Sequence, residues 1–476
     1  MYQFFHIFRN FFESGIFIYT SVLFSSYFLL SLISAFEMRK YILKNSFVDY
    51  SEILASPYVP AISVIAAAYN EGRTIVENIR SLLALHYNSY DVIIVNDAST
   101  DDSMQKIIEE FDLIKIDFFY NSVLITKPIK GIYRSRNESF SKLIVVDKEN
   151  GGKADSINAG LNVSTNKYYL AIDVDCVLES DSLVKMVKPF LEATDKKVIA
   201  TGGTIRIINS CTVVNGKVVE VTVPKNLISR AQVLEYTRSF LMGRMAWSRL
   251  NGLLIISGAF GMFDREIVIN IGGYSSVTLG EDLELIVRMR RYMHDIKEKY
   301  RVIYIPDPLC WTEVPAKVKI LSRQRNRWTR GTVATLLIHR KMFFNPRYGF
   351  IGMISFSFWV IFEWFAPFVE FFGILYFLLI IALGNPNWVL FSLMIGFAYC
   401  FGVTFSVGAI LYEQLSYQKY KKPIDLFRLI VMAFFEPLFF HPMLVWFALK
   451  GNYLFLVGER RWGKMDRKGF GSASNA

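Results

Sequence analysis

The sequence predicts an α/β domain with a mostly parallel central sheet, combined with an α-helical transmembrane bundle. Between residue 60 and about residue 345, short apolar runs end in polar residues and are followed by helical patterns, as in buried parallel strands. Hydrophobic residues make up 53% of the 476 residues, and their excess lies at the N-terminal end and after about residue 348. One stretch of 22 residues, Gly15 to Phe36, carries no charge.

Composition and charge narrow the function classes. Charged residues make up 20% of the chain, against about 25% in ordinary globular proteins, which excludes a disordered chain, a coiled coil or a small disulfide scaffold. The net charge is +11, and basic residues cluster beside the apolar segments. We interpret this as the positive-inside bias of a membrane protein. No zinc spacing or RNA-binding signature supports nucleic acid as a partner. The four cysteines lack paired spacing, which favours a reducing, cytoplasmic compartment.

The N-terminal unit, residues 1–45, is predicted to be a transmembrane helix and a connector. Its uncharged stretch would extend about 33 Å as a helix, enough for one bilayer crossing. The run is too long for a signal peptide, and no signal-peptide cleavage site follows it. Because Arg39, Lys40 and Lys44 follow it, that side and the next domain are expected to be cytoplasmic, in a multi-pass protein of the cell membrane.

Residues 46–345 are predicted to form the α/β domain with its interface helices. Its expected strands are residues 62–67, 92–95 and 168–172, and Asn215-Gly216 between β-branched residues predicts a hairpin over 213–221. Residues 234–250 are amphipathic and fit either a core helix or a helix on the membrane surface.

Residues 346–457 are predicted to be interfacial and transmembrane helices. The 36 residues from Gly349 to Gly384 are too many for one straight crossing, so we expect an interfacial helix that runs into a crossing at about Pro367. Residues 388–412 form a clean crossing, whereas residues 426–449, broken by polar residues and prolines, could be a re-entrant pair. Residues 458–470 are a basic tail, and 471–476 resemble a cloning remnant.

Polar side chains follow three of the expected strands. Asp173 and Asp175 come after one strand, Asp97 after another, and Tyr69 and Glu71 after the first. Ligands of open α/β sheets bind beyond the carboxyl ends of the strands, and paired carboxylates suit Mg²⁺ or Mn²⁺ bridging a diphosphate. The alternatives are a turn at Asp173–Asp175 and helix capping at Asp97.

Three further strings suggest a catalytic or binding role, and each also has a different interpretation. Lys153 follows two glycines and can approach a phosphate, although the spacing excludes a Walker site. Glu281-Asp282 precedes a helical stretch and is either dipole compensation or a general base. The string QRNRW, residues 324–328, places Trp328 among arginines, which fits membrane anchoring or sugar stacking beside a diphosphate.

Together these strings resemble the membrane-integrated, processive family 2 glycosyltransferases, which make cellulose, mixed-linkage glucan, poly-N-acetylglucosamine, chitin and hyaluronan. The resemblance covers about residues 60–345 and, more loosely, the flanking membrane segments. It rests on seven strings in order: YNE at 69–71, NDAST at 96–100, GGKA at 151–154, DVD at 173–175, SGAFG at 257–261, GED at 280–282 and QRNRW at 324–328.

The resemblance implies a GT-A-like domain and a role for each residue. Asp282 would be the catalytic base and Asp175 the metal ligand, with Mg²⁺ or Mn²⁺. The nucleotide sugar would be bound by Tyr69, Glu71, Asp97, Lys153 and Asp173. The acceptor and diphosphate would be bound by Ser257, Gly258, Glu281, Gln324, Arg325, Arg327 and Trp328. Trp462, Lys464 and Arg467 partially match a gating-loop motif.

The function expected from the resemblance is polymerisation of a UDP-activated sugar, by inversion, into a β-linked polysaccharide that crosses the membrane. The GED, SGAFG and WGKM strings favour UDP-glucose and a β-glucan. The alternatives are a poly-N-acetylglucosamine or hyaluronan-type synthase, or a non-processive transferase acting on a lipid carrier. A transporter with an α/β regulatory domain fits less well, because the carboxylates lie in the soluble part. The expected partners are the donor, the growing polysaccharide, the bilayer and accessory export subunits, with no nucleic acid.

Overall fold

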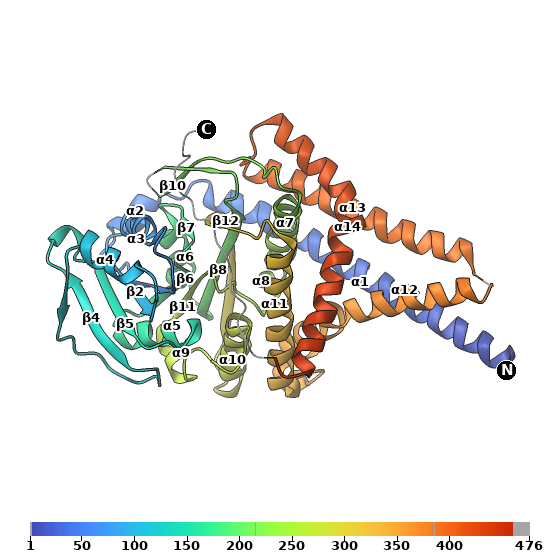
Figure 1. The fold of residues 1–476 in the computed structure, drawn as a ribbon, viewed down its shortest axis with the longest axis horizontal. Helices are drawn as coiled ribbons and strands as arrows, with labels where there is room; N and C mark the ends of the chain where they lie inside the picture. Colours follow the sequence, from blue (N-terminus) through green and yellow to red (C-terminus); the bar gives the residue numbers. More distant parts are fainter. Residues whose placement is uncertain (1, 215, 385, 460–476) are drawn as a thin grey trace.

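The computed structural model describes residues 2–214, 216–384 and 386–459, and its centre is a ten-stranded sheet (Figure 1). The strand order is β3-β4-β5-β2-β1-β6-β11-β8-β12-β7, and β4, β11 and β7 run opposite to the others. The strands are β1 (Ile62–Ala68), β2 (Tyr90–Asp97), β3 (Leu113–Ile116), β4 (Ile129–Ser135), β5 (Leu143–Lys148), β6 (Tyr168–Asp173), β7 (Val177–Leu178), β8 (Lys197–Ile207), β11 (Phe260–Asp264) and β12 (Tyr300–Thr312).

The three strands predicted from apolar runs are confirmed as β1, β2 and β6. They lie next to one another in parallel register and are almost wholly buried, as expected for strands covered on both faces. The predicted hairpin is confirmed as β9 (Thr212–Val214) and β10 (Lys217–Glu220), which pair antiparallel. Asn215 of its turn lies outside the described residues.

Helices and short helical turns connect and cover the strands. Around the sheet they are α2 (Tyr50–Ala55), α3 (Ile75–Leu83), α4 (Ser103–Glu110), η1 (Glu138–Phe140), α5 (Lys153–Val163), α6 (Ser182–Leu191), α9 (Arg265–Asn270) and α10 (Glu281–Asp295). Helix α5 packs against β1 and β2, and α6 packs against β8 and β12. These contacts fix the strand ends that carry the predicted polar residues.

A second group of helices lies between the sheet and the long apolar helices (Figure 1). It consists of α7 (Leu227–Thr237), the π-helical turn η2 (Arg238–Gly243), α8 (Arg244–Arg249) and α11 (Val318–Ile338). The amphipathic stretch predicted over residues 234–250 falls within the run α7–η2–α8. Helix α7 packs against β8 and α14 (Pro423–Leu456), and α8 packs against β12 and α1 (Tyr2–Asn45). The run therefore lies at the junction between the sheet and the apolar helices, and its interpretation as a core helix or a membrane-surface helix stays a prediction.

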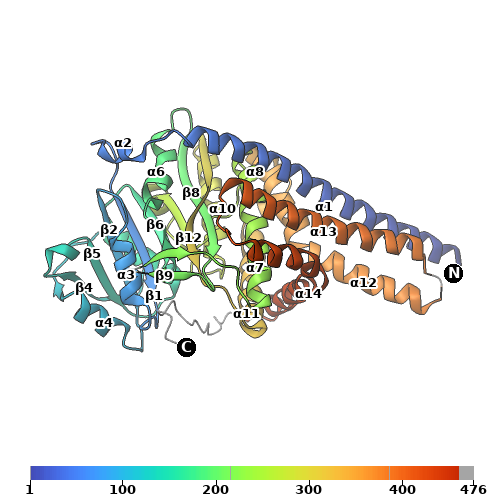
Figure 2. The ribbon, with the colours of Figure 1, turned by 90° about the horizontal axis from the view of Figure 1, so that it is seen from above.

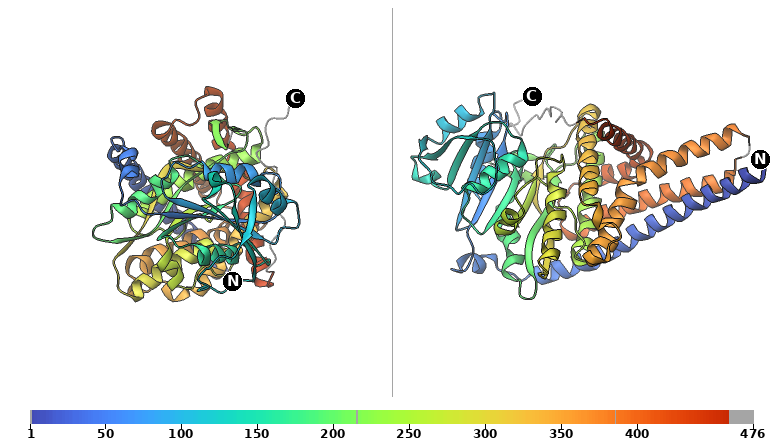
Figure 3. Two further views of the ribbon diagram at one scale, coloured as in Figure 1. Left: turned by 90° about the vertical axis from the view of Figure 1, so that its left-hand side faces the viewer. Right: turned by 90° about the horizontal axis from the view of Figure 1, so that it is seen from below.

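Within the described residues, four segments are long and apolar enough to span a membrane: Arg9–Asn45, Ile351–Ala382, Trp388–Ser416 and Pro423–Leu456. Helices α1, α12 (Ala366–Ala382) and α13 (Trp388–Ser416) lie side by side and point away from the sheet (Figures 2 and 3). Ion pairs join α13 and α14 to the rest of the chain: the buried pair of Arg206 of β8 with Glu413 of α13 at 2.9 Å, and the pair of Arg238 with Glu436 of α14 at 2.8 Å.

The interfacial helix that runs into a crossing at about Pro367 stays a prediction, and the chain bends close to that position. After η3 (Arg340–Met342) and η4 (Pro346–Tyr348), two π-helical segments, η5 (Ile351–Phe356) and η6 (Trp359–Trp364), precede a bend at Phe365, and α12 follows. Ile351 and Phe356 pack with Leu254 and with Leu283 of α10, so η5 is covered by elements next to the sheet.

The predicted re-entrant pair at residues 426–449 is wrong. Helix α14 runs unbroken from Pro423 to Leu456, with Pro437 and Pro442 inside it. Each proline removes one backbone hydrogen bond, but α14 packs along α11 and α13, and its Glu436 accepts two hydrogen bonds from Arg238. These tertiary contacts explain why the polar and proline residues do not break the helix.

Candidate active site

The DVD string stands where β6 ends, beside the loop that leads into β11. Asp173 is the last residue of β6, and Phe260 of β11 pairs with Ile172 just before it. The loop Ser257–Gly258–Ala259 is therefore held next to the two aspartates. Both aspartates line a large cavity, and Asp175 is buried.

Lys153, the first residue of α5, connects three of the predicted strings. Its Nζ forms an ion pair with the Asp173 carboxylate and donates a hydrogen bond to the Gly258 carbonyl at 2.9 Å. Glu281 Oε1 lies 3.7 Å away. Burial alone would lower the pKa of Lys153, but the carboxylates of Asp173 and Glu281 raise it above its usual value. Lys153 is therefore a fixed positive charge among carboxylates.

Asp282 lies in the first turn of α10, and both of its carboxylate oxygens accept backbone hydrogen bonds. Oδ2 accepts from the Gly258 N–H at 2.9 Å, and Oδ1 accepts from the Leu283 N–H at 2.8 Å. A Cβ atom at position 258 would lie 3.3 Å from Asp282 Oδ2 and 3.2 Å from Lys153 Nζ, which is close enough to disturb both groups. The neighbouring Glu281 is buried, and burial raises its pKa, an effect that Lys153 opposes.

The start of α10 is held against α11 by two glycines. A Cβ atom on Gly331 of α11 would lie 2.5 Å from the backbone nitrogen of Gly280, so the two backbones touch. This contact sets Asp282 relative to the QRNRW string on α11. Residues Gln324, Arg325, Arg327 and Trp328 of that string all line the same cavity.

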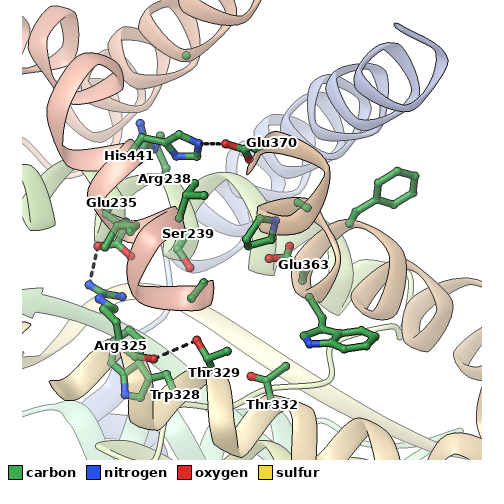
Figure 4. A pocket seen from close by; sticks show the side chains of 18 of the residues that line it. Glu235, Arg238, Ser239, Arg325, Trp328, Thr329, Thr332, Glu363, Glu370 and His441 are labelled. Atoms are coloured by element: carbon green, nitrogen blue, oxygen red, sulfur yellow. Dashed lines mark hydrogen bonds and ion pairs between the residues drawn. The ribbon is translucent and has the colours of Figure 1, made fainter. Parts of the chain in front are cut away.

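Figure 4 shows Arg325 and Trp328 of the QRNRW string beside Glu235. Arg325 donates to Glu235 of α7 at 2.7 Å, and its guanidinium lies 4.1 Å from the centroid of the Trp328 ring. Trp328 is 39% exposed, and it lines the cavity. An indole that is held by a cation and lines a cavity can stack on a sugar ring.

The cavity has a volume of about 1790 Å³ and continues from Asp282 into the apolar helices. There it is lined by aromatic side chains, which include Tyr19, Phe24, Tyr27, Phe377, Phe391 and Tyr399. Polar groups alternate with them: Glu363 accepts from Tyr27 at 2.9 Å, and Glu370 pairs with His441 at 2.8 Å (Figure 4). Mixed aromatic and hydrogen-bonding walls suit a hydrated saccharide.

Three predicted donor-binding residues do not line this cavity. Asp97 is buried and accepts from Lys148 Nζ at 2.8 Å and from the N–H groups of Gly151 and Gly152 at 2.9 and 2.8 Å. It therefore holds the loop that places Lys153. Tyr69 is 51% exposed, and the backbone N–H of Glu71 donates to Ser103. Their predicted contact with the nucleotide stays a prediction.

The cavity also contains residues that sequence reasoning missed, notably Arg73, Glu235, Tyr236 and Arg244. Glu235, Tyr236 and Arg244 belong to the amphipathic stretch, whose mixture of charged and aromatic residues was the available signal. The predicted gating-loop residues Trp462, Lys464 and Arg467 lie outside the described residues.

The carboxylate ligands at the end of β6 fit a hard divalent cation. Asp173 and Asp175 both line the cavity, and their carboxylate oxygens are the hard ligands that Mg²⁺ and Mn²⁺ prefer. Within the ranges that the structure describes, no group of three or more His, Cys, Asp or Glu side chains could hold a metal ion. Further ligands for Mg²⁺ or Mn²⁺ would have to come from the phosphates of a bound donor.

Comparison with known proteins identifies the enzyme family. The sequence model described as "Glycosyltransferase like family 2" matches residues 136–331, which contain the GGKA, DVD, SGAFG, GED and QRNRW strings. A poly-beta-1,6-N-acetyl-D-glucosamine synthase of Staphylococcus epidermidis is 27% identical over 280 residues, 59% of this chain and 56% of the relative. Residues 136–331, which contain these strings, are therefore those of a family 2 glycosyltransferase.

A second relative is also a poly-beta-1,6-N-acetyl-D-glucosamine synthase. It comes from Staphylococcus aureus (strain COL) and is 25% identical over 279 residues, 58% of this chain and 55% of the relative. The chain thus matches about half the length of these relatives. A solved mannosyltransferase from Pyrobaculum calidifontis, in complex with GDP-Man and Mn²⁺, superposes with a TM-score of 0.52 at 16% identity, covering 94% of this chain and 100% of the other. The predicted GT-A fold is confirmed.

Proposed function

We propose that this glycosyltransferase polymerises N-acetylglucosamine from UDP-N-acetylglucosamine into a β-linked polysaccharide and passes the product between its apolar helices. The observation that carries this proposal is the single cavity that leads from Asp282 and Asp175 to the aromatic side chains of the apolar helices. A transferase that adds one sugar to a lipid carrier has no need of such a passage.

The choice of donor corrects the sequence analysis. The strings favoured UDP-glucose, but the named relatives are poly-N-acetylglucosamine synthases, which supports the amino sugar better than a β-glucan. The alternative product of the sequence analysis is therefore our proposal, with a β-1,6 linkage taken from the same relatives.

The proposed chemistry uses the charges that surround Gly258. The acceptor hydroxyl oxygen attacks C1 of the donor sugar, Asp282 takes the hydroxyl proton, and the bond from C1 to the diphosphate breaks to release UDP. Lys153 and Arg327 offer positive charge to the departing diphosphate. A divalent cation held by Asp175 and the phosphates would neutralise part of the same charge when bound.

The decisive experiment supplies radiolabelled UDP-N-acetylglucosamine or UDP-glucose to the purified chain in proteoliposomes. We expect polymer only from the amino sugar, and digestion only by a hydrolase specific for β-1,6-linked N-acetylglucosamine. Polymer from UDP-glucose alone would restore the β-glucan assignment, and a product that stops after one sugar would favour the non-processive alternative.

Removal of divalent cations should stop synthesis. Excess EDTA is expected to reduce UDP release to background, and Mg²⁺ or Mn²⁺ should restore it, because Asp175 offers only hard oxygen ligands. The measurement is the rate of UDP release before and after re-addition. Undiminished turnover in excess chelator would show that the aspartates act without a metal ion.

Trp328→Ala should shorten the polymer and weaken acceptor binding about 2–13-fold while sparing UDP binding, because stacking contacts are worth about 0.5–1.5 kcal/mol. Product length and acceptor KM, per folded molecule, test this. The matched control is Trp446→Ala on α14, since Trp446 is 60% exposed and is not among the residues that line the cavity. If Trp328 only anchored the chain in the membrane, both variants would lower membrane yield and leave product length unchanged.

We further propose that the catalytic part faces the cytoplasm of a multi-pass cell-membrane protein, with accessory subunits that help export the polymer. Arg39, Lys40 and Lys44, at the catalytic end of α1, support this orientation. Protease added to intact spheroplasts should leave the catalytic part uncut, whereas protease added to inverted vesicles should cleave it.

A further inference from the structure

Arg244 is a positive charge that faces the cavity and has no carboxylate partner among the described residues. It is half-buried, and it has no hydrogen bond or ion pair with any residue in the described ranges. Three other cations of the cavity each pair with a carboxylate: Lys153 with Asp173, Arg238 with Glu436, and Arg325 with Glu235. A guanidinium that is partly withdrawn from water gains from a hydrogen-bond acceptor, and here a ligand in the cavity can supply it.

The fork of Arg244 is held in one orientation by an aromatic ring. Its guanidinium carbon lies 3.9 Å from the centroid of Phe240, one turn earlier in the same helical run. Tyr236 and Trp247 of that run line the cavity as well. The surroundings of Arg244 therefore combine donor N–H groups with an apolar wall.

Arg244 and the two aspartates reach the cavity from different elements. It starts α8, which packs against β12 and α1, whereas Asp173 and Asp175 stand at the end of β6. Burial lowers the pKa of Arg244, and the nearby Tyr304 and Asp282 oppose that shift, so Arg244 is within electrostatic range of the proposed base. Arginine remains charged in either case.

We propose that Arg244 is a specificity-determining ligand of the acceptor sugar, and that its guanidinium donates hydrogen bonds to the N-acetyl carbonyl oxygen at the growing end. This inference rests on the proposed function. An acetamido group matches the site twice, because its oxygen accepts from the guanidinium and its methyl group packs on the aromatic wall. A glucose hydroxyl offers no methyl group, and a uronate offers oxygens without one.

The test measures binding and needs no turnover. The purified full chain in lipid nanodiscs is titrated with three β-linked trisaccharides that end in N-acetylglucosamine, glucose or glucuronate, and separately with UDP. Arg244→Leu should weaken binding of the N-acetylated trisaccharide about 10–100-fold, the range expected for hydrogen bonds to a charged group. Binding of the glucose trisaccharide and of UDP should stay at the wild-type value.

Two further variants keep the test decisive. Arg249→Leu is the matched control, because Arg249 lies on the same helix, pairs with Glu37 at 2.9 Å and is not among the cavity-lining residues; it should bind all four ligands normally. Arg244→Lys keeps the charge but not the fork, so it should show a smaller loss for the N-acetylated trisaccharide, and it replaces the leucine variant if that variant does not fold.

Three results would overturn the inference: equal loss for the N-acetylated and glucose trisaccharides, a larger loss of UDP affinity than of acceptor affinity, or tighter wild-type binding of the glucuronate trisaccharide than of the N-acetylated one. Failure of the proposed function would appear elsewhere, as absence of transfer from UDP-N-acetylglucosamine by the wild-type enzyme.

Discussion

The Asp282→Asn enzyme should bind UDP as the wild type does and make no detectable polymer. An amide cannot take the proton of the acceptor hydroxyl, and a positioned general base contributes roughly 10²–10⁴-fold in rate. The substitution keeps the shape of the side chain, and the amide oxygen can still accept the hydrogen bond from the Gly258 N–H. UDP release and polymer yield, per mole of folded enzyme, measure the effect.

The control for Asp282 stands at the other end of the same helix. Asp295 is partly exposed and pairs with Arg347 at 3.2 Å, so Asp295→Asn should leave turnover unchanged. Wild-type turnover in the Asp282→Asn enzyme would remove Asp282 as the base and direct attention to the buried Glu281 beside it.

Lys153→Met should lower kcat by about 10²–10³-fold, the usual cost of losing one preorganised group that stabilises developing charge. The substitution removes the cation that contacts Asp173 and Gly258 and that lies 3.7 Å from Glu281. The carboxylates around it would then repel one another and the incoming diphosphate. We therefore expect weaker UDP binding as well as slower turnover, measured by calorimetry and by UDP release.

Two variants separate charge from position in this prediction. Lys153→Arg keeps the charge and should recover UDP binding more than turnover. The longer, planar guanidinium cannot occupy the position from which Lys153 Nζ donates to the Gly258 carbonyl. Lys167→Met removes an exposed lysine that follows α5 and should behave as wild type. Normal UDP binding in the Lys153→Met enzyme would mean that Lys153 only supports the loop at Gly258.

The sequence pattern of a segment was sufficient to predict its structure where the residues of that segment alone determine it. The strands β1, β2 and β6 could be predicted because a strand buried on both faces needs an unbroken apolar run. Helix α14 could not, because what compensates its internal prolines comes from other elements: the packing of α11, and Arg238, which is 198 residues away from Glu436 in sequence.

The same distinction applies to the site. Asp173, Lys153 and Asp282 could be named from motifs, and the structure brings all three together at Gly258. Asp97 follows a strand in the same way, yet its oxygens are turned to Lys148 and the Gly151–Gly152 loop. Position after a strand does not reveal which partner a carboxylate meets. For Arg244, the telling property is the lack of a carboxylate partner, which only a three-dimensional arrangement can reveal.

The contacts of α1 bear on the order of biosynthesis. The Tyr19 hydroxyl donates to the Ile361 carbonyl, 342 residues later, and Tyr27 donates to Glu363, 336 residues later. At about 5–20 residues per second, a ribosome needs roughly 17–70 s to make these partners. During that interval lipid alone must retain α1, a task for its exposed apolar side chains such as Phe17, Ile18 and Phe28. A charge placed among them would cause losses at insertion, before the catalytic part has folded, whereas loss of the Tyr27 hydroxyl would be felt only when the finished bundle closes.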